Sequence, residues 1–486
     1  MKKLIVISYC FLQAVTVNGQ AGRSDFKKVN DTIVAKFNRG DYQGIYAMAG
    51  ESYKVQTQQR SLVNDLKDDK KIAGNIVSST MTEDLGKVKH FKWVGESANL
   101  NFELWMDDTT IIRFKFNDLT TQPGWTDHPV RTDNSLKTSL DSIVQIYAAR
   151  YMASPKAAGL SIGIYLNGKK YIYNYGEVEK GTGKLPEGKT IYSLGSVTKT
   201  FIGILLAKAV MDHKLGLQDD IREYLPDNFP NLAYQGHPVR LIDLATHSWG
   251  FNRWRINVFP ANYESMSAAE QLRYYDAYTK DSLYRDLHLA KIDTLPGVRY
   301  HYNIGSMLLI GMALEKVYQQ PLDQIVRDYY GKTLQMPDTK LISDAADLKR
   351  YAKGYNEKGE LMPPIPHATP SLYTMKTTTA DMLNYLEANV LEKEPAIKLS
   401  HQPAWGNPKS FSLGLFWQVT DDLGQSRWIK HTGYDGGSIT MCSVHPEEKL
   451  GMIIWANDDS RQNNLFDIER NIREHILYRK LSAGKN

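Results

Sequence analysis

The chain contains little cysteine, no strong excess of either charge and only one long apolar run. Two cysteines, Cys10 and Cys442, occur in 486 residues, and only Cys442 remains if the N-terminal segment described below is removed, which excludes an intramolecular disulfide. A formal net charge of +5 is too small to favour nucleic acid as a partner. The 12 histidines show no H-E-x-x-H or paired spacing, so we expect neither a metal site nor another cofactor.

The single long apolar run lies at the N-terminus. Lys2 and Lys3 precede apolar residues from Leu4 to Val17, and Gly19 offers a small residue for cleavage. We interpret residues 1–19 as a secretory signal peptide, which predicts a periplasmic or secreted protein. No other stretch approaches 18 apolar residues, so we expect no stable membrane span.

The chain is too long for one ordinary core, and its hydrophobic periodicity changes along its length. Residues 24–118 begin with helical spacing and continue with strand-like alternation at Leu100, Phe102 and Leu104. This order predicts a small N-terminal α+β domain, which looks like the cystatin-like modules. Residues 119–134 have the composition of a linker.

Residues 135–482 form the second predicted domain. The dipeptide Asn167-Gly168 between two β-rich runs is a strong hairpin signal. Strand-like runs gather at both ends of this domain, and residues 201–392 between them are mostly helical or loop-like. Further strands are expected at 412–419, 439–444 and 450–456, with helices at 135–152 and 465–476. We therefore predict an α+β fold, in which one antiparallel sheet is flanked by N- and C-terminal helices and carries an inserted helical lobe.

Ser196 and Lys199 form the pattern S-x-x-K where a short β-like run breaks at Gly195 and helical periodicity begins. Residues three apart share one helix face at about 5 Å between Cβ atoms, so the Lys199 ammonium should lie beside the Ser196 hydroxyl. Free backbone N–H groups at a helix start also stabilise negative charge. A second copy of the pattern, at Ser24 and Lys27, has no strand before it, and we attribute it to chance.

One other match to a known motif is excluded by the residues that follow it. Residues 183–190 match the letters of a phosphate-binding loop, which must leave a strand and open a helix. Strand-like Ile191–Ser193 follows here instead, and Pro186 stiffens the loop. We predict no nucleotide site.

Two later segments accompany S-x-x-K. Tyr302 follows a turn at Pro296-Gly297 and precedes an apolar helix, and His431-Thr432-Gly433 stands at the edge of a strand. In this order and with these flanks the motifs resemble the superfamily of serine β-lactamases and D-Ala-D-Ala peptidases, in particular its class C-related branch of serine hydrolases. The resemblance covers roughly Leu136 to Lys480. Stretches 239–251, 371–383 and 412–417 agree with it.

The resemblance and the chemistry together suggest a role for each residue. Ser196 would attack a carbonyl carbon and become acylated, with Lys199 or Tyr302 accepting its proton; the sequence leaves open which one. The oxyanion would sit between the N–H groups of Ser196 and Tyr434. His431 replaces the lysine of the usual K-T-G, so it would offer charge to a substrate carboxylate only near or below about pH 6.5.

Three further positions affect which substrate the site can bind. Thr432 and Gly433 are expected to line the substrate-binding strand beside His431. The usual second motif is Tyr-x-Asn, whereas this chain has the aliphatic Ile304 in the Asn position. The amide contact normally made there is therefore in question.

Three functions are compatible with these motifs. The first is a secreted or periplasmic serine hydrolase acting on D-amino-acid peptides, cell-wall fragments or small esters. The second is a class C-like β-lactamase, which needs fast deacylation as well as acylation. The third is a non-catalytic sensor of penicillin or peptidoglycan, although an intact set of Ser196, Lys199 and Tyr302 argues against it. The partner in each case is a small molecule, a peptide or peptidoglycan.

Overall fold

The computed structural model describes residues 25–483 except 51–52, 55–58, 85, 87, 108–109, 118–129, several positions between 254 and 276, 357, 363–373, 410, 423–425, 436 and 460–464. The expected signal peptide and most of the expected linker lie outside these residues. In the described part of the chain, no helix has the length and apolar character needed to cross a membrane.

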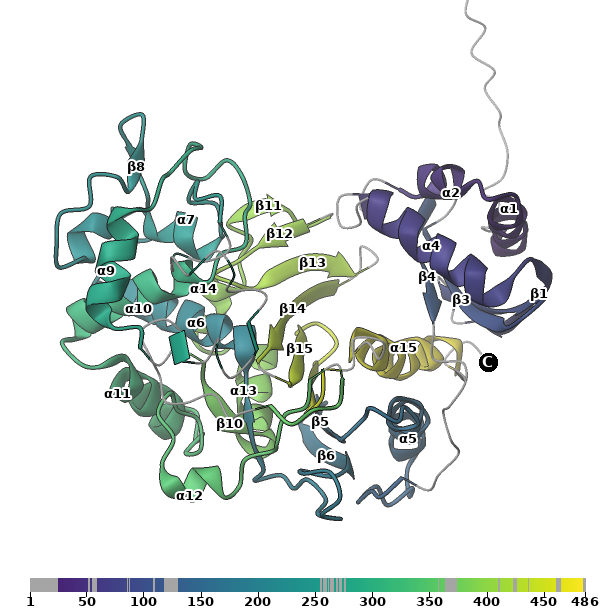
Figure 1. The fold of residues 1–486 in the computed structure, drawn as a ribbon. Helices are drawn as coiled ribbons and strands as arrows, with labels where there is room; N and C mark the ends of the chain where they lie inside the picture. The colour runs from purple at the N-terminus through teal and green to yellow at the C-terminus, as the bar shows by residue number, and fades with distance from the viewer. Residues whose placement is uncertain are drawn as a thin grey trace, which may run out of the picture.

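An antiparallel sheet of eight strands forms the centre of the larger unit, in the order β11-β12-β13-β14-β15-β16-β5-β6 (Figure 1). Its strands are β5 (Gly159–Leu166), β6 (Lys169–Gly176), β11 (Trp405–Asn407), β12 (Phe411–Leu413), β13 (Gln418–Asp422), β14 (Ser426–Tyr434), β15 (Ile439–His445) and β16 (Leu450–Ala456). Asn167 and Gly168 join β5 to β6 with positive φ angles of 50° and 83°, as a tight hairpin requires. Strands from both ends of the larger unit thus meet in one sheet.

The sheet is buried on both faces. Along β16, Met452 and Ile454 pack with α5 (Ser139–Met152) and α15 (Leu465–Ala483), whereas Ile453 and Trp455 join the core on the opposite face. This alternation follows from the two-residue period of a strand. The predicted α+β fold, an antiparallel sheet flanked by terminal helices with a helical lobe, is confirmed.

One predicted strand is wrong. Residues 412–419 do not form a continuous strand, because the chain turns between β12 and β13, where Gly414 N–H donates to the Trp417 carbonyl at 2.9 Å. Phe416 has a φ of 65° in this turn, and its N–H donates to the Ala245 carbonyl at 2.8 Å. The apolar pattern of the segment reflects burial in the turn as well as in strands.

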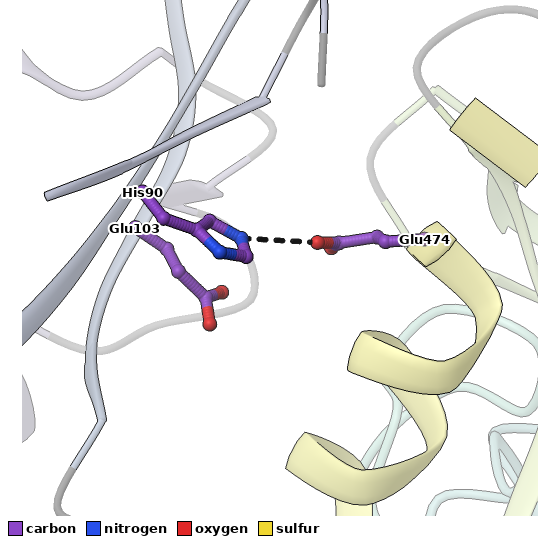
Figure 2. A group of neighbouring side chains, drawn as sticks. All are labelled: His90, Glu103 and Glu474. Carbon is purple, nitrogen blue, oxygen red and sulfur yellow. Dashed lines mark hydrogen bonds and ion pairs between the residues drawn. The ribbon is translucent and has the colours of Figure 1, made fainter. Parts of the chain in front are cut away.

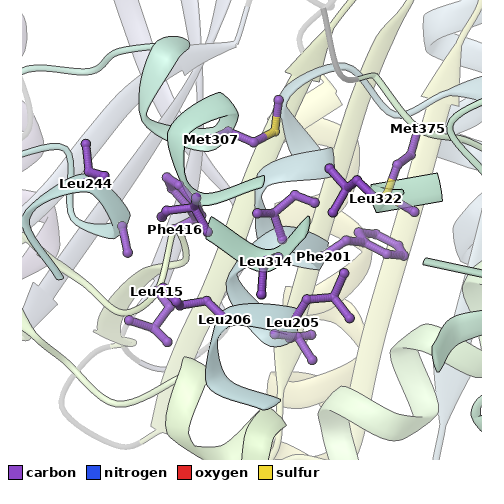
Figure 3. Packing of buried hydrophobic residues seen from close by; sticks show 14 of the residues in the cluster. Phe201, Leu205, Leu206, Leu244, Met307, Leu314, Leu322, Met375, Leu415 and Phe416 are labelled. Atoms are coloured by element: carbon purple, nitrogen blue, oxygen red, sulfur yellow. The ribbon is translucent and has the colours of Figure 1, made fainter. Parts of the chain in front are cut away.

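The helical lobe lies between β6 and β11 in the chain and is built around α6 (Thr198–Met211). Most residues of α6 are buried, and from Phe201 to Ala207 all of them are apolar or glycine, as expected for a helix enclosed on every side (Figure 3). The other elements of the lobe are β7 (Ile191–Ser193), the 3₁₀ turns η1 (Gly195–Val197) and η2 (Ile221–Tyr224), β8 (Ala233–Tyr234), β9 (His237–Pro238), α7 (Leu241–Ala245), α9 (Lys280–His288), α10 (Gly305–Tyr318), α11 (Leu322–Val326), the π-helical η4 (Arg327–Thr333), α12 (Ala345–Leu348), β10 (Lys376–Thr378), α13 (Thr379–Leu391) and α14 (Pro395–Ser400).

The N-terminal residues build their own sheet and core. Helices α1 (Phe26–Arg39), α2 (Tyr42–Met48) and α4 (Gln59–Ala73) precede four antiparallel strands, β1 (Ile76–Asp84), β2 (Val88–Gly95), β3 (Asn99–Asp107) and β4 (Thr110–Asn117). Trp93 packs against Phe37 and Phe102 with ring centroids 5.5 and 4.7 Å apart. We call residues 26–117 the N-terminal unit. Its likeness to cystatin modules stays a prediction.

A buried network of charged side chains joins the N-terminal unit to α15, which lies between that unit and the large sheet (Figure 1). His90 on β2 stands opposite Glu103 on β3, and its Nε2 lies 3.4 Å from Glu474 of α15 (Figure 2). Arg470 Nε lies 2.9 Å from Glu103 Oε2. Burial favours the neutral imidazole, but hydrogen bonds to Glu474 and Glu83 outweigh burial and raise the pKa of His90 to about 10.

Removal of the Arg470 charge should therefore destabilise the protein. Arg470 is 1% exposed, and Arg470→Met would leave the buried Glu103 carboxylate without this partner, at a cost of about 3–5 kcal/mol. We expect a lower midpoint in urea unfolding followed by tryptophan fluorescence. Lys27→Met, which breaks an exposed pair with Asp31, is the control and should leave the midpoint unchanged. A wild-type midpoint in Arg470→Met would contradict the stabilising role of the network.

Candidate active site

The structure brings Ser196, Lys199 and Tyr302 together, as the sequence predicts. Lys199 Nζ lies 3.3 Å from Ser196 Oγ, and the Tyr302 hydroxyl donates to the same oxygen at 2.6 Å. The ammonium of Lys199 also lies 4.9 Å from the centre of the Tyr302 ring. Ser196 belongs to the 3₁₀ turn η1 that leads into α6, so the helix begins two residues later than its side-chain periodicity suggests. The serine oxygen thus has two possible proton acceptors within hydrogen-bond reach.

Strand pairing fixes the segment that carries Ser196. Strand β7 pairs with β10, and Leu194 N–H donates to the Met375 carbonyl at 2.9 Å. The Met375 N–H donates to the Thr198 hydroxyl at 2.9 Å. Met375, the residue before β10, therefore holds the nucleophile segment on both sides of Ser196.

The end of β14 approaches the same segment closely. A Cβ atom on Gly195, which has a φ of 50°, would lie 2.6 Å from the Tyr434 nitrogen, and one on Gly433 would collide with the Leu194 carbonyl. The position of that Gly433 Cβ is also 3.2 Å from the Ser196 nitrogen. Two glycines thus allow two backbones to meet. The backbone nitrogens of Ser196 and Tyr434 both lie at this contact, and their role as oxyanion donors stays a prediction.

His431 lies on β14 beside the site, but its electrostatics differ from the expectation. Burial and then the charge of Lys199 lower the pKa of His431 to about 3. The expectation that His431 carries a positive charge near or below pH 6.5 is therefore wrong. The imidazole is buried, which the sequence does not show. His431 Nδ1 lies 2.7 Å from the Thr432 carbonyl, which assigns the proton to Nδ1 and leaves Nε2 as an acceptor.

The remaining predicted site residues lie around Ser196, Lys199 and Tyr302. Thr432 and Gly433 pair with Met441 and Thr440 of β15, which places them in register at the end of β14. The side chain of Tyr434 is 52% exposed, so its ring faces solvent while its backbone meets Gly195. Ile304 is partly exposed immediately before α10.

Sequence reasoning missed His247. This buried residue adopts a φ of 53°, and its ring centroid lies 4.7 Å from that of Tyr302. Its Nδ1 accepts a hydrogen bond from Asn303 N–H at 3.3 Å. Burial, followed by the charge of Lys199, lowers the pKa of His247 well below the usual value, so it is neutral. No spacing in the sequence distinguishes it from the other histidines.

Sequence reasoning also missed Lys376 and Asp435, which are buried near Ser193. Neither belongs to a motif, and a lysine in the run MKTTT gives no sign of burial. Their arrangement is described below.

One group of potential metal ligands meets in the described part of the chain. Donor atoms of His90, Glu103 and Glu474 lie within 4.8 Å of one another (Figure 2). The guanidinium of Arg470 already contacts Glu103 and Asp467 at this place. We therefore interpret the group as part of the ion network between β2, β3 and α15, and no step of the chemistry at Ser196 depends on it.

The fold and the site define a serine hydrolase of the β-lactamase and transpeptidase type. The model of the Beta-lactamase family matches residues 144–476, which is more than half of the chain, and the chain belongs to this family. The match begins after the N-terminal unit.

Curated relatives and solved structures agree with this assignment. A beta-lactamase of Psychrobacter immobilis is 25% identical over 355 residues, covering 65% of this chain and 83% of the relative. The D-alanyl-D-alanine-carboxypeptidase/endopeptidase AmpH of Escherichia coli (strain K12) is 22% identical, covering 67% and 86%. A beta-lactamase/D-alanine carboxypeptidase from Pseudomonas syringae superposes with a TM-score of 0.57 at 22% identity, covering 70% of this chain and 99% of that one, which supports the fold.

Proposed function

We propose that the protein is a periplasmic or secreted serine hydrolase that forms an acyl-enzyme on Ser196 and acts on D-amino-acid peptides, cell-wall fragments or small esters. The observation that carries this proposal is the position of Ser196 Oγ, 3.3 Å from Lys199 Nζ and 2.6 Å from the Tyr302 hydroxyl. A nucleophile within hydrogen-bond reach of its base is the general signature of covalent acyl transfer.

The chemistry proceeds in two halves. In the first, Ser196 Oγ bonds to the carbonyl carbon while its proton passes to Lys199 or Tyr302, and the N–H groups of Ser196 and Tyr434 stabilise the oxyanion. The tetrahedral intermediate then expels the leaving group, which takes a proton from the same pair of residues. In the second half, water attacks the acyl carbon and gives a proton to Lys199 or Tyr302. The bond between that carbon and Ser196 Oγ then breaks, and Oγ takes a proton back from the same pair of residues. Lys199 and Tyr302 both lie within hydrogen-bond reach of Ser196 Oγ, so the geometry supports proton transfer by either residue.

Two positions favour substrates other than β-lactams. Ile304 cannot donate or accept a side-chain hydrogen bond, and the neutral His431 provides no positive charge for a carboxylate. A β-lactam would leave its amide and its carboxylate without these two partners. Small esters depend less on either contact. A class C-like β-lactamase is therefore the second candidate, supported by the names of the relatives, and a non-catalytic sensor is third.

A substrate panel tests this ranking. We expect the mature protein to hydrolyse a short p-nitrophenyl ester or a D-aminoacyl peptide, and to turn over a chromogenic cephalosporin weakly or not at all. The double variant Ile304→Asn/His431→Lys, which restores both polar partners, should raise cephalosporin turnover by about tenfold or more relative to ester turnover. Ser196→Ala serves as the blank for all three substrates. Efficient cephalosporin turnover by the unchanged protein, with the ester and the peptide untouched, would reverse the ranking.

A further inference from the structure

A buried polar cluster lies beside the contact between Ser196 and Tyr434, and the proposed mechanism does not use it. Its members are Ser193, Lys376 and Asp435, with exposed fractions of 4%, 3% and 9%. A buried lysine and a buried carboxylate are costly to keep unless each has a partner. Their presence this close to the candidate active site requires an explanation.

The cluster connects the two segments that carry the proposed oxyanion donors. The Ser193 hydroxyl donates to Asp435 Oδ2. Ser193 ends β7 three residues before Ser196, and Asp435 directly follows Tyr434. One hydrogen bond therefore ties the backbone before the nucleophile to the backbone after the second N–H donor.

Neighbouring strands hold Ser193 in place. The Ser193 carbonyl accepts hydrogen bonds from Thr440 Oγ1 and Trp455 Nε1, both at 3.3 Å. Its Cα stands opposite that of Lys376 in the β7–β10 pair. Ser193 is thus attached to the large sheet through β15 and β16, and to the lobe through β10.

Lys376 supplies the charge that Asp435 needs. Burial raises the pKa of Asp435, while the Lys376 ammonium and the Ser193 hydroxyl favour its ionised form. Burial likewise lowers the pKa of Lys376, and the Asp435 carboxylate opposes this shift. The Lys376 ammonium also donates to the Thr374 carbonyl at 2.8 Å, which fixes its position.

We propose that Lys376 and Asp435 are positioning residues that set the spacing between the Ser196 and Tyr434 N–H groups through Ser193. This inference rests on the proposed function, because it assumes that these two groups bind the oxyanion. The glycines at 195 and 433 let the two backbones approach each other, and the cluster fixes how far apart they stay. Neither charged side chain needs to touch the substrate.

The test compares turnover with affinity for a transition-state analogue. Asp435→Asn and Lys376→Met should each lower kcat for the p-nitrophenyl ester by about tenfold to a thousandfold with little change in KM, since losing one oxyanion donor has effects of about this size. Binding of a phenylboronic acid, whose tetrahedral adduct places an oxygen between the two N–H groups, should weaken by a similar factor. The double variant should lose less than the product of the two single losses, because the two charges act as a pair.

Controls separate positioning from general stability. Lys340 and Asp347 form another buried pair, with Nζ and Oδ2 2.7 Å apart, and the Lys340 backbone pairs with Lys376 on β10. Asp347→Asn should lower the melting temperature without a selective loss of boronate affinity. Ser193→Ala removes the hydrogen bond to Asp435 but leaves the Lys376 and Asp435 charges together. It provides the test if Asp435→Asn does not fold, and it should also weaken boronate binding.

Two results would overturn the inference. One is a folded Asp435→Asn or Ser193→Ala protein with unchanged kcat and boronate affinity. The other is an equal loss in Asp435→Asn and Asp347→Asn. Either result leaves the proposed function standing as long as Ser196→Ala is inactive. An active Ser196→Ala protein would instead refute the proposed function itself.

Discussion

Ser196→Ala is expected to lower ester and peptide hydrolysis by about 10⁴-fold or more. The reason is that the substitution removes the oxygen that lies within hydrogen-bond reach of both Lys199 Nζ and the Tyr302 hydroxyl. Without Oγ no acyl-enzyme forms, and water must attack the substrate directly. The measurement is the steady-state rate with the best substrate of the panel, at a protein concentration high enough to quantify the residual rate.

The second S-x-x-K copy provides a matched control. Ser24→Ala removes a serine that precedes a lysine at the same spacing, and it should retain the wild-type rate. The fold of both variants can be compared by circular dichroism and thermal unfolding. Near-normal hydrolysis by a folded Ser196→Ala protein would mean that another group, or no covalent step, carries the reaction.

Lys199→Arg and Lys199→Ala are both expected to lose most acylation, by about 10²- to 10⁴-fold. Arginine keeps the positive charge but cannot give up its proton, and alanine removes the amine altogether. If Lys199 acts through its neutral amine, the two variants should be similarly slow. The measurement is the rate of labelling by a fluorophosphonate probe, which reports acylation without the second half-reaction.

Tyr302→Phe completes this series, because it removes only the hydroxyl that lies 2.6 Å from Ser196 Oγ. We expect a large loss here as well. A greater loss than in Lys199→Arg would assign Tyr302 as the principal base. Lys208→Arg is the control, since Lys208 pairs with Asp212 at the far end of α6 and should not affect labelling. A Lys199→Arg protein with a near-normal rate would show that only positive charge matters at this position.

Local sequence signals predicted the features of the fold that depend on neighbours in the chain. The Asn167-Gly168 turn, the alternation at Leu100, Phe102 and Leu104, and the helical run that became α6 each follow from backbone preference or side-chain period. The S-x-x-K spacing likewise predicted the contact between Ser196 and Lys199. Tyr302 was placed correctly only through the resemblance, because 106 residues separate it from Ser196.

Features that depend on burial were not predictable from the sequence. The neutral state of His431 results from burial and then from the charge of Lys199, neither of which a local pattern reveals. The interaction of Lys376 with Asp435 joins a residue of β10 to the residue that follows β14. No pattern in the sequence shows that Arg470 of α15 is buried beside Glu103 of the N-terminal unit. In each case a distant segment decides the environment.

The most direct test of the central claim is mass spectrometry of the mature protein after reaction with a fluorophosphonate probe, followed by peptide mapping. The account predicts one adduct per chain, located on the peptide that contains Ser196, and no adduct in Ser196→Ala. Labelling that survives in Ser196→Ala, or an adduct mapped to a different residue of the unchanged protein, would contradict it.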